Sequence, residues 1–314
     1  METRGEMVAY GNRKGKAPKL SVIIPSYRSG GKLYQAVESV LAQHYDNFEL
    51  IICDDGSEDF EKDQVRRLTG DRVVKFLCHR ANMGTVCSLN EGLLLCEGEW
   101  VLVLAADDAL AEDGVLSGIM ERAEETEKEW LTGPALLCDG DLRPSGQQIP
   151  TRAQRELLKR GDFREIWGRL CQGCFIPSGG TAYRRDLLLR QGGFDTHCRL
   201  VEDWPLFLKL VRTGILPEVL DEPVTLHRAD GVSQRQAGQN RAYQRDLIET
   251  MDREILPWLD LLPGREGKRL QVLCRDKKEI YRLRFETAGT GARAGWLLAH
   301  PGTVLRRMTR KDGG

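Results

Sequence analysis

Short apolar runs alternate with amphipathic stretches along the N-terminal third of the chain. The runs at residues 20–24, 48–53 and 100–105 are continuous and short, as in strands that are buried on both faces of a sheet. Between them, residues 32–43 and 85–96 place leucine and valine three or four positions apart, which is the spacing of one helix face. The alternation predicts an α/β fold with a doubly wound, mostly parallel, Rossmann-like sheet and helices on both faces.

The regular alternation weakens after residue 129. Shorter apolar runs, a turn at residues 143–146 and helical spacing over residues 151–168 follow. From residue 236 onward the pattern is mostly helical, with charged faces. We therefore predict a flexible N-terminal tail (1–19), one large α/β domain (20–235) and a helical C-terminal extension (236–314).

Length and cysteine content favour one large domain with reduced thiols. A chain of 314 residues can bury a sizeable core, and its apolar runs are far shorter than the ~20 residues of a membrane-spanning helix. Residues 1–19 are basic but lack the apolar segment of a secretion signal. Nine cysteines scattered over a chain without such a signal are typical of reduced thiols, so we expect a cytoplasmic protein.

Charge is distributed unevenly along the chain. Residues 265–312 hold 13 Lys and Arg against 5 Asp and Glu, an excess of +8, which leaves −9 for the rest because the net charge is −1. Apolar residues at 296–298 and 304–308 lie beside these cations. The segment is either a helical arm packed on the core with a solvated basic face, or a peripheral contact with an anionic membrane. We expect no nucleic-acid partner.

Polar residues follow the first two predicted strands. Ligands of doubly wound sheets bind beyond the carboxyl ends of the strands, where this chain has Pro25, Ser26 and Tyr27 and then Asp55. A carboxylate at Asp55 can accept the imino N–H of a pyrimidine, while Tyr27 stacks on the ring. The alternative is that residues 54–57 only form a turn, since Asp, Gly and Ser are ordinary turn residues.

Two adjacent acids, Asp107 and Asp108, follow the run that ends at residue 105. Carboxylates at the end of a buried strand must be solvated, paired or metal-bound, and a divalent cation together with a diphosphate explains both of them. The alternative is that Asp108 is the N-cap of the next helix. His227 ends another apolar run and is either a metal ligand or a satisfied structural histidine.

A third acidic group precedes the amphipathic stretch at residues 206–212. Glu202, Asp203 and Trp204 stand there in succession. Asp203 suits the cap of the helix, and it equally suits a general base that takes a proton from an attacking sugar hydroxyl, a role that contributes ~10²–10⁴ in rate. A capping role does not exclude catalysis. Glu202 and Trp204 flank Asp203 on the side where an acceptor would bind.

The order of these motifs resembles the family 2 glycosyltransferases of the GT-A fold, over residues 20–233. The motifs that carry the resemblance are residues 21–27, 38–43, 48–57, 82–92, 107–108, 192–195 and 202–203, followed by His227. The resemblance implies that residues 20–110 bind the nucleotide and that residues 111–235 face the acceptor. It also implies that Tyr27 and Asp55 bind the base and that Pro25 and Ser26 belong to the loop that holds them.

The resemblance assigns the remaining roles as well. Asp107 and Asp108 match the acids that bind the ribose-diphosphate and the metal, Asp203 matches the catalytic base, and His227 matches a histidine that approaches the metal in some members. The implied reaction is an inverting transfer from a nucleotide sugar, with uridine favoured, assisted by Mn²⁺ or Mg²⁺. The acceptor is a hydroxyl of a saccharide or a lipid-linked saccharide, as in the synthesis of cell-surface polysaccharide or glycolipid.

The chain departs from the family pattern at three points. Ala105 stands where an additional acid is usual, and Leu89 stands where an arginine often precedes Asn90. The Gln-x-x-Arg-Trp signature of processive synthases is absent from the sequence, which implies the transfer of a single sugar.

Three other interpretations are weaker. A nucleotidyltransferase would carry a glycine-rich loop with Arg and Lys after the first strand, and residues 25–31 offer no such loop. A non-catalytic nucleotide-sugar-binding protein would have no need of the three acids at 107, 108 and 203. A zinc site formed by Cys171 and Cys174 with His197 and Cys198 is disfavoured because contiguous ligands rarely converge on one ion.

Overall fold

A computed structural model describes residues 5–10, 19–229 and 240–287. Its main sheet has eight strands, and four adjacent ones are parallel, as the sequence predicts. Antiparallel partners flank this parallel centre on both sides. In spatial order the strands are β1 (Glu6–Tyr10), β4 (Val74–Cys78), β3 (Phe48–Asp54), β2 (Leu20–Ser26), β5 (Trp100–Val103), β10 (Ala182–Arg184), β7 (Trp130–Thr132) and β11 (Glu218–Val219).

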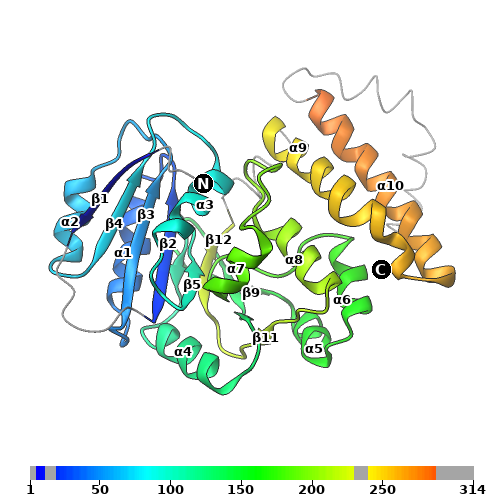
Figure 1. The fold of residues 1–314 in the computed structure, drawn as a ribbon, viewed down its shortest axis with the longest axis horizontal. Helices are drawn as coiled ribbons and strands as arrows, with labels where there is room; N and C mark the ends of the chain where they lie inside the picture. The colour runs from blue at the N-terminus through cyan, green and yellow to red at the C-terminus, as the bar shows by residue number, and fades with distance from the viewer. Residues whose placement is uncertain (1–4, 11–18, 230–239, 288–314) are drawn as a thin grey trace.

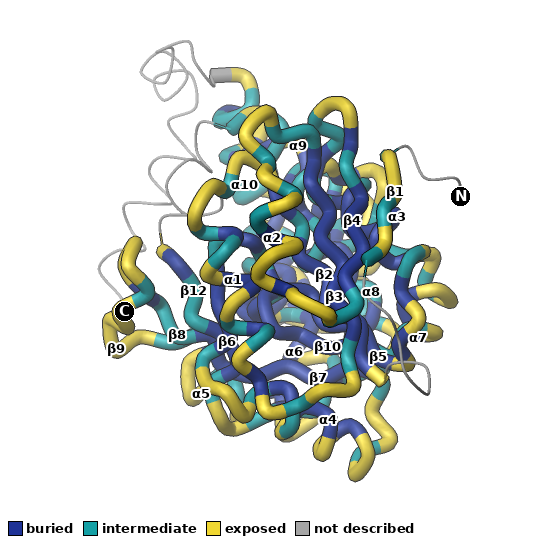
Figure 2. The backbone as a smooth tube through the Cα atoms, turned by 90° about the vertical axis from the view of Figure 1, so that its left-hand side faces the viewer, coloured by how far each residue is buried: buried dark blue, intermediate teal, exposed yellow. Residues whose placement is uncertain are grey.

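Alternate residues of the central strands enter two separate cores, one on each face of the sheet. Val22 and Ile24 pack into one core and Ile23 packs into the other. Helices therefore cover both faces, and the central strands are buried along their length (Figures 1 and 2). The first core includes α1 (Gly31–Leu41), α2 (Lys62–Thr69) and α4 (Val115–Glu125), and the second includes α3 (Thr85–Leu95), α6 (Phe163–Leu170), α7 (Arg185–Gln191) and α8 (Asp203–Arg212).

The prediction of a flexible tail over residues 1–19 is wrong for residues 6–10. These form β1, which pairs antiparallel with β4 at the edge of the sheet (Figure 1). An exposed edge strand leaves unpaired backbone groups, and β1 satisfies those of β4. The Tyr10 ring also packs edge-on against Phe76, with the ring centroids 5.9 Å apart. Backbone pairing and one aromatic contact therefore order a segment whose composition alone predicts no structure.

A second, four-stranded sheet brings distant parts of the sequence together. Its order is β6 (Ala109–Leu110), β12 (Thr225–Arg228), β8 (Ala135–Cys138) and β9 (Pro144–Ile149). Because β6 directly follows Asp108, the pairing of Leu226 with Ala109 places His227 next to that acid. Helix α4 begins only at Val115, so the alternative that Asp108 caps the next helix is wrong.

The helical stretch predicted over residues 151–168 is two helices. Thr151 and Gln154 form a capping box at the start of α5 (Arg152–Arg160), and Gly161 ends that helix in the left-handed conformation. Asp162 then accepts two backbone N–H groups at the start of α6. Together α5 and α6 lie below α8 (Figure 1).

The described part of the C-terminal extension is helical, as predicted. It comprises α9 (Arg241–Thr250), a π-turn (Met251–Ile255), a 3₁₀ turn (Leu256–Leu261) and α10 (Gly264–Thr287). Leu247, Met251 and Cys274 join the same core as α6 and α8, so this part packs on the domain. Residues 288–314 of the basic segment lie outside the described residues. None of the described helices is long and apolar enough to cross a lipid bilayer.

Candidate functional site

The Asp55 carboxylate is fixed at the end of β3 by the loop that follows β4. It is 3% exposed. Its Oδ1 accepts hydrogen bonds from His79 Nδ1 at 2.8 Å and from the Met83 backbone N–H at 2.7 Å, and its Oδ2 accepts from the Gly84 N–H at 2.7 Å. These three donors leave the carboxylate a single orientation, and Oδ2, which accepts only one of them, retains acceptor capacity for a ligand.

Tyr27 lies beside this acid with an accessible ring. Its side chain is 42% exposed, and the Arg28 guanidinium lies 5.2 Å from the ring centroid. Pro25 and Ser26 are the last residues of β2, and the Ser26 carbonyl accepts the Asp55 N–H at 2.8 Å. The predicted base-binding residues thus belong to adjacent strand ends and are joined by the backbone.

The alternative interpretation, in which residues 54–57 form a turn, describes Asp54, the residue before Asp55. Its Oδ2 accepts the Ser57 N–H at 2.9 Å, which closes a local turn. The Ser57 hydroxyl in turn accepts the Arg28 N–H at 2.8 Å. Asp54 therefore shapes the loop, whereas Asp55 points toward the β4 loop.

Asp108 and His227 are paired, and Asp107 stands next to them. His227 Nδ1 lies 2.9 Å from Asp108 Oδ2, and Asp108 Oδ1 accepts the Arg228 N–H at 3.1 Å. Asp108 is buried, whereas Asp107 and His227 are partly exposed. Asp107 and Asp108 both belong to the short segment between β5 and β6, which brings these acids to the carboxyl edge of the sheet.

Arg228 is a buried residue of this site that the sequence interpretation missed. Its guanidinium donates to the backbone carbonyl of Gly140 at 2.9 Å and also to the carbonyl of Asp107 and to Gln35 Oε1. A fully buried arginine at the end of a strand has to be compensated in this way. Arg228 therefore fixes the backbone that carries the two acids, and only its charge within an apolar run hinted at such a role.

The electrostatics of the acid pair suit a divalent cation. Burial and the charge of Asp108 raise the pKa of Asp107 above its ordinary value. Burial lowers the pKa of His227, but the hydrogen bond and charge of Asp108 more than compensate, so this pKa is also raised. Carboxylate and imidazole are ligand types that Mn²⁺ or Mg²⁺ accepts, and a cation would relieve the repulsion between the acids. In the described structure the ligand atoms of Asp107, Asp108 and His227 do not all lie within 4.8 Å of one another, so these side chains would have to move together to hold one ion.

Glu202 and Asp203 form a second acidic pair at the start of α8. Burial and the charge of Asp203 raise the pKa of Glu202 to about 8, and burial also raises the pKa of Asp203. Asp203 Oδ1 accepts the Trp204 N–H at 2.6 Å, and Oδ2 lies 3.5 Å from the Cys174 thiol sulfur. Raised pKa values are typical of carboxyl groups that exchange protons near neutral pH.

Trp204 is buried, whereas its neighbours Glu202 and Asp203 are partly exposed. It is 2% exposed, and its indole N–H donates to the Leu170 carbonyl at 2.8 Å. Its position is that of a core residue between α8 and α6, so the acceptor-side role predicted for it lacks an accessible surface. Glu202, which is partly exposed, keeps that role as a prediction.

One loop, residues 177–181, lies between the two acidic pairs. Ser178 hydrogen-bonds to the Glu202 side chain. A β-carbon added at Gly179 would lie 3.2 Å from Asp108 Oδ2, so this loop backbone runs directly against the acid. The loop is held by the Gly180 N–H, which donates to the Val103 carbonyl at 2.8 Å. Asp108 and Glu202 therefore face the same short loop, although 94 positions separate them in the sequence.

Two polar contacts position the segment that leads to Asp203. The Asn90 side chain exchanges hydrogen bonds with the backbone of Phe194 at 2.8 and 2.9 Å, which ties this segment to α3. Asp246 of α9 accepts the N–H groups of residues 199–201 at 2.8, 2.5 and 3.1 Å. Asp246 was missed because an acid on a charged helix carries no local signal of such a role.

A family model supports the resemblance that the order of the motifs indicates. A sequence model described as "Glycosyl transferase family 2" matches residues 21–192, more than half of the chain. The chain belongs to glycosyl transferase family 2. The matched region of the family covers both strand-end sites and Asn90, and it ends before Asp203.

Curated relatives in the family share moderate identity with parts of this chain. An uncharacterised glycosyltransferase of Nostoc sp. is 30% identical over 177 residues, which cover 54% of this chain and 52% of the relative. The GalNAc(5)-diNAcBac-PP-undecaprenol beta-1,3-glucosyltransferase of Campylobacter jejuni is 37% identical over 110 residues, 34% and 35% of the two chains. A PGL/p-HBAD biosynthesis glycosyltransferase of Mycobacterium bovis is 28% identical over 195 residues, 60% and 68%.

Solved structures confirm the GT-A-like fold. TarS 1–349 of S. aureus in complex with UDP-GlcNAc superposes with a TM-score of 0.54 at 16% identity, covering 86% of this chain and 91% of that one. The mannosyltransferase PcManGT of Pyrobaculum calidifontis, in complex with GDP-Man and Mn²⁺, gives a TM-score of 0.55 at 17% identity, covering 94% and 80%. At these identities the likeness concerns the fold.

Proposed function

We propose that this family 2 glycosyltransferase transfers a single sugar from a nucleotide-sugar donor to an acceptor hydroxyl, with inversion and with a divalent cation. The observation that carries the proposal is the loop at 177–181. This loop lies between Asp108, a candidate metal ligand, and the acidic pair of Glu202 and Asp203. A diphosphate bound on one side of this loop and an acceptor bound on the other would approach each other at one edge of the sheet.

Donor binding rests on the two strand ends. Tyr27 offers an accessible ring on which a base can stack, and the oriented Asp55 carboxylate can accept an imino N–H from uracil. We favour a uridine diphosphate sugar. The complexes of TarS with UDP-GlcNAc and of PcManGT with GDP-Man support a nucleotide-sugar donor in general.

The cation would be held by Asp107, Asp108 and His227, and it would be either Mn²⁺ or Mg²⁺. When bound, such an ion neutralises the diphosphate leaving group. The residues themselves do the positioning: Arg228 fixes the backbone of Asp107, and Asp108 orients His227. The Mn²⁺ in the PcManGT complex supports a divalent metal in this fold.

Asp203 is the proposed general base. Its carboxylate would take the proton of the acceptor hydroxyl as the hydroxyl oxygen attacks the anomeric carbon. The bond to the nucleoside diphosphate breaks on the opposite face, which inverts the configuration. Glu202, whose pKa is about 8, holds its own proton at neutral pH and so adds no second negative charge beside the base.

The acceptor and the place of action follow from the relatives. The Campylobacter jejuni protein is named for a substrate linked to PP-undecaprenol, and we propose a saccharide or lipid-linked saccharide acceptor in cell-surface polysaccharide or glycolipid synthesis. The enzyme would work in the cytoplasm, held on the inner face of the membrane by the basic segment 265–312. We keep residues 20–110 as the nucleotide-binding part and 111–235 as the acceptor side.

A donor panel tests the proposal. Thermal unfolding of the full chain is measured with UDP-, GDP- and TDP-sugars, with Mn²⁺, Mg²⁺ or a chelator. A donor at 100 times its dissociation constant adds about 2.7 kcal/mol to stability, so one nucleotide sugar should stand out when metal is present. The anomeric configuration of the product then reports inversion. Equal unfolding temperatures over the whole panel would refute nucleotide-sugar binding.

A further inference from the structure

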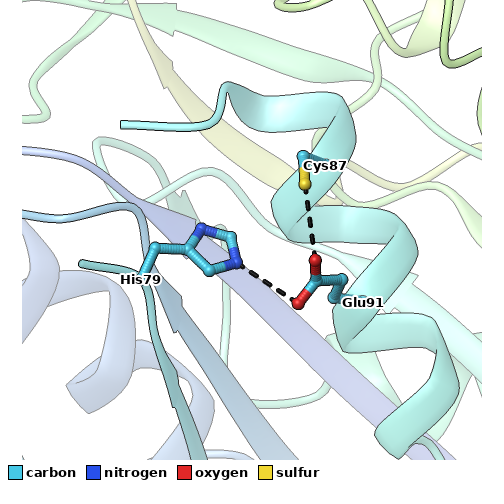
Figure 3. Close-up of side chains that lie close together, drawn as sticks. All are labelled: His79, Cys87 and Glu91. Atoms are coloured by element: carbon cyan, nitrogen blue, oxygen red, sulfur yellow. Dashed lines mark hydrogen bonds and ion pairs between the residues drawn. The ribbon is translucent and has the colours of Figure 1, made fainter. Parts of the chain in front are cut away.

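Three side chains of different chemistry converge beside Asp55. His79, Cys87 and Glu91 each offer one potential ligand atom, and these atoms lie within 4.8 Å of one another, with the Glu91 carboxylate facing both other side chains (Figure 3). His79 Nε2 is 3.5 Å from Glu91 Oε2, and the Cys87 sulfur is 3.5 Å from Glu91 Oε1. Within the described parts of the chain, no other His, Cys, Asp and Glu side chains form such a group of three or more.

The two 3.5 Å separations, which end on different oxygens of Glu91, are close to those expected around a tetrahedral ion. With bonds of 2.0–2.1 Å to nitrogen or oxygen and 2.3 Å to sulfur, ligand atoms around zinc lie roughly 3.3–3.6 Å apart. Cys87 and Glu91 stand four residues apart on α3, so the helix presents both on one face. His79 approaches from the end of β4, so an ion would join two elements.

The hydrogen bond to Asp55 orients the His79 ring and places the proton of a neutral ring on Nδ1. Asp55 accepts two backbone N–H groups, and its Oδ1 also lies 2.8 Å from His79 Nδ1. A carboxylate that accepts at both oxygens requires Nδ1 to carry the proton. In a neutral ring the lone pair is then on Nε2, which points at Glu91 (Figure 3). A carboxylate that orients a histidine ligand is the usual outer shell of a zinc site.

His79 Nε2 provides an independent sign of a missing partner. The histidine is 6% exposed, and Nε2 makes no hydrogen bond of normal length; its nearest acid, Glu91 Oε2, is 3.5 Å away. A buried polar atom without a partner at normal hydrogen-bond length is destabilising, so its persistence calls for an explanation. An ion bound to Nε2 would supply the partner.

An ion can reach the cluster from a cavity of about 880 Å³. Cys87 and Glu91 line this cavity on the α3 side, together with Arg199 from the segment before α8 and Arg241 and Arg245 from α9. His79 is not among the residues that line this cavity. A fourth position of a tetrahedral ion would therefore open toward the cavity, where water or an anionic ligand can occupy it.

We propose that His79, Cys87 and Glu91 bind one Zn²⁺, or an ion of the same class, at a site separate from the Asp107–Asp108 pair. Thiolate with imidazole selects zinc or cobalt over the hard cations that bind carboxylates and phosphates. Binding releases the Cys87 thiol proton to solvent. Through His79 the ion also holds Asp55, so the zinc site supports the strand end at which the donor base is proposed to bind.

The competing explanation is an ion pair. A protonated His79 between Asp55 and Glu91 would need no metal, and Cys87 would then be incidental. The two explanations differ in their dependence on Cys87, because only a metal needs the thiolate.

The test uses the full chain, stripped with a chelator and dialysed, and measures Zn²⁺ binding by competition with an indicator and Co²⁺ binding by absorbance. We expect one tight zinc ion per chain and a near-ultraviolet thiolate-to-cobalt band. Cys87→Ser should remove the band and weaken zinc binding at least 10-fold, and Glu91→Gln should weaken it similarly. Asp108→Ala should leave the cobalt band in place.

Cys78→Ser is the matched control. Cys78 directly precedes His79 but packs against the opposite core, so its loss should change neither reading. Circular dichroism checks that each variant is folded, and the wild-type cobalt band is informative even if a variant is not. Zinc binding equal in wild type and Cys87→Ser, or no stoichiometric binding by wild type, would overturn the proposal in favour of the ion pair. Donor binding at Asp107–Asp108 can persist or fail independently of this result.

Discussion

His227 Nδ1 lies 2.9 Å from Asp108 Oδ2, across 119 positions of sequence. Each of these residues is a candidate metal ligand, and each holds the other in place. Asp108→Ala removes one ligand and frees the second, and it leaves the Arg228 N–H without its acceptor. We expect this variant to lose metal-dependent donor binding, measured by calorimetry with Mn²⁺ and with a chelator.

A surface acid provides the control for Asp108→Ala. Asp141 is exposed and pairs only with Arg143 among the described ion pairs, so Asp141→Ala should bind donor like wild type. Activity that persists at full strength in excess chelator would contradict a role for the metal.

The Asp203→Asn variant keeps the shape of the side chain and removes the base. Turnover should fall by ~10²-fold or more, with donor affinity nearly unchanged. Because burial raises the pKa of Asp203, wild-type kcat/KM should also decline toward acid pH at a value above the ordinary carboxyl range. Steady-state rates over a pH series measure both effects. Turnover close to wild type in Asp203→Asn would remove this residue from the mechanism.

The raised pKa of Glu202 predicts that the free energy of unfolding depends on pH. Its pKa is about 8 in the folded protein and 4.5 in its ordinary state, so between these values the folded state binds a proton that the unfolded state has lost. The contribution to stability is therefore complete below 4.5 and is lost as the pH rises through 8.

Glu202→Gln should flatten this dependence. The urea midpoint of the variant should equal or fall below that of wild type at pH 4.5 and exceed it at pH 8.5. The raised pKa of Asp203 leaves a smaller slope of the same sign in both proteins. Parallel curves for the two proteins would show that Glu202 titrates in its ordinary range.

The Tyr27→Ala variant tests the stacking surface. Stacking of a base on an aromatic ring contributes ~1–3 kcal/mol, so donor affinity should fall by about 10- to 100-fold. Since the ring is exposed, the free energy of unfolding should change by less than ~1 kcal/mol. Tyr27→Phe retains the ring and should bind like wild type. Unchanged donor affinity in Tyr27→Ala would place the base elsewhere.

Deletion of residues 294–314 tests the membrane hypothesis. The deleted segment contains four Arg and Lys near its end, each worth ~1 kcal/mol at an anionic surface. We expect the shortened chain to leave anionic vesicles at moderate salt while donor hydrolysis is retained, in a sedimentation assay with neutral vesicles as control. Equal vesicle binding by the two chains would assign the cations to another role.

The sequence predicts the nucleotide half of the fold well because its strands and helices are local patterns. The runs that became β2 and β3 are apolar at nearly every position, and α1 and α3 keep a clear helical spacing. The short strand β1 was missed because its order depends on the edge of β4. The pairing of Asp108 with His227 was likewise beyond local pattern, since a second sheet creates it.

The site shows the same limit. Asp55, Asp107 and Asp203 were predicted because motif order marks them, whereas the buried partners His79, Arg228 and Asp246 carry no such mark. Each of these three acts through a contact with a residue far away in the sequence. Local composition does not encode such contacts, so only the folded chain reveals them.

The three hydrogen bonds that Asp246 accepts from residues 199–201 make the extension part of the support for Asp203, the proposed base. A chain cut at residue 235 would retain both strand-end sites but would leave three backbone N–H groups beside Asp203 without their acceptor. Exchanging this extension between relatives would therefore alter turnover, in addition to any effect on where the enzyme is located. The rate of the proposed sugar transfer would thus depend on a helix that lies outside the two strand-end sites.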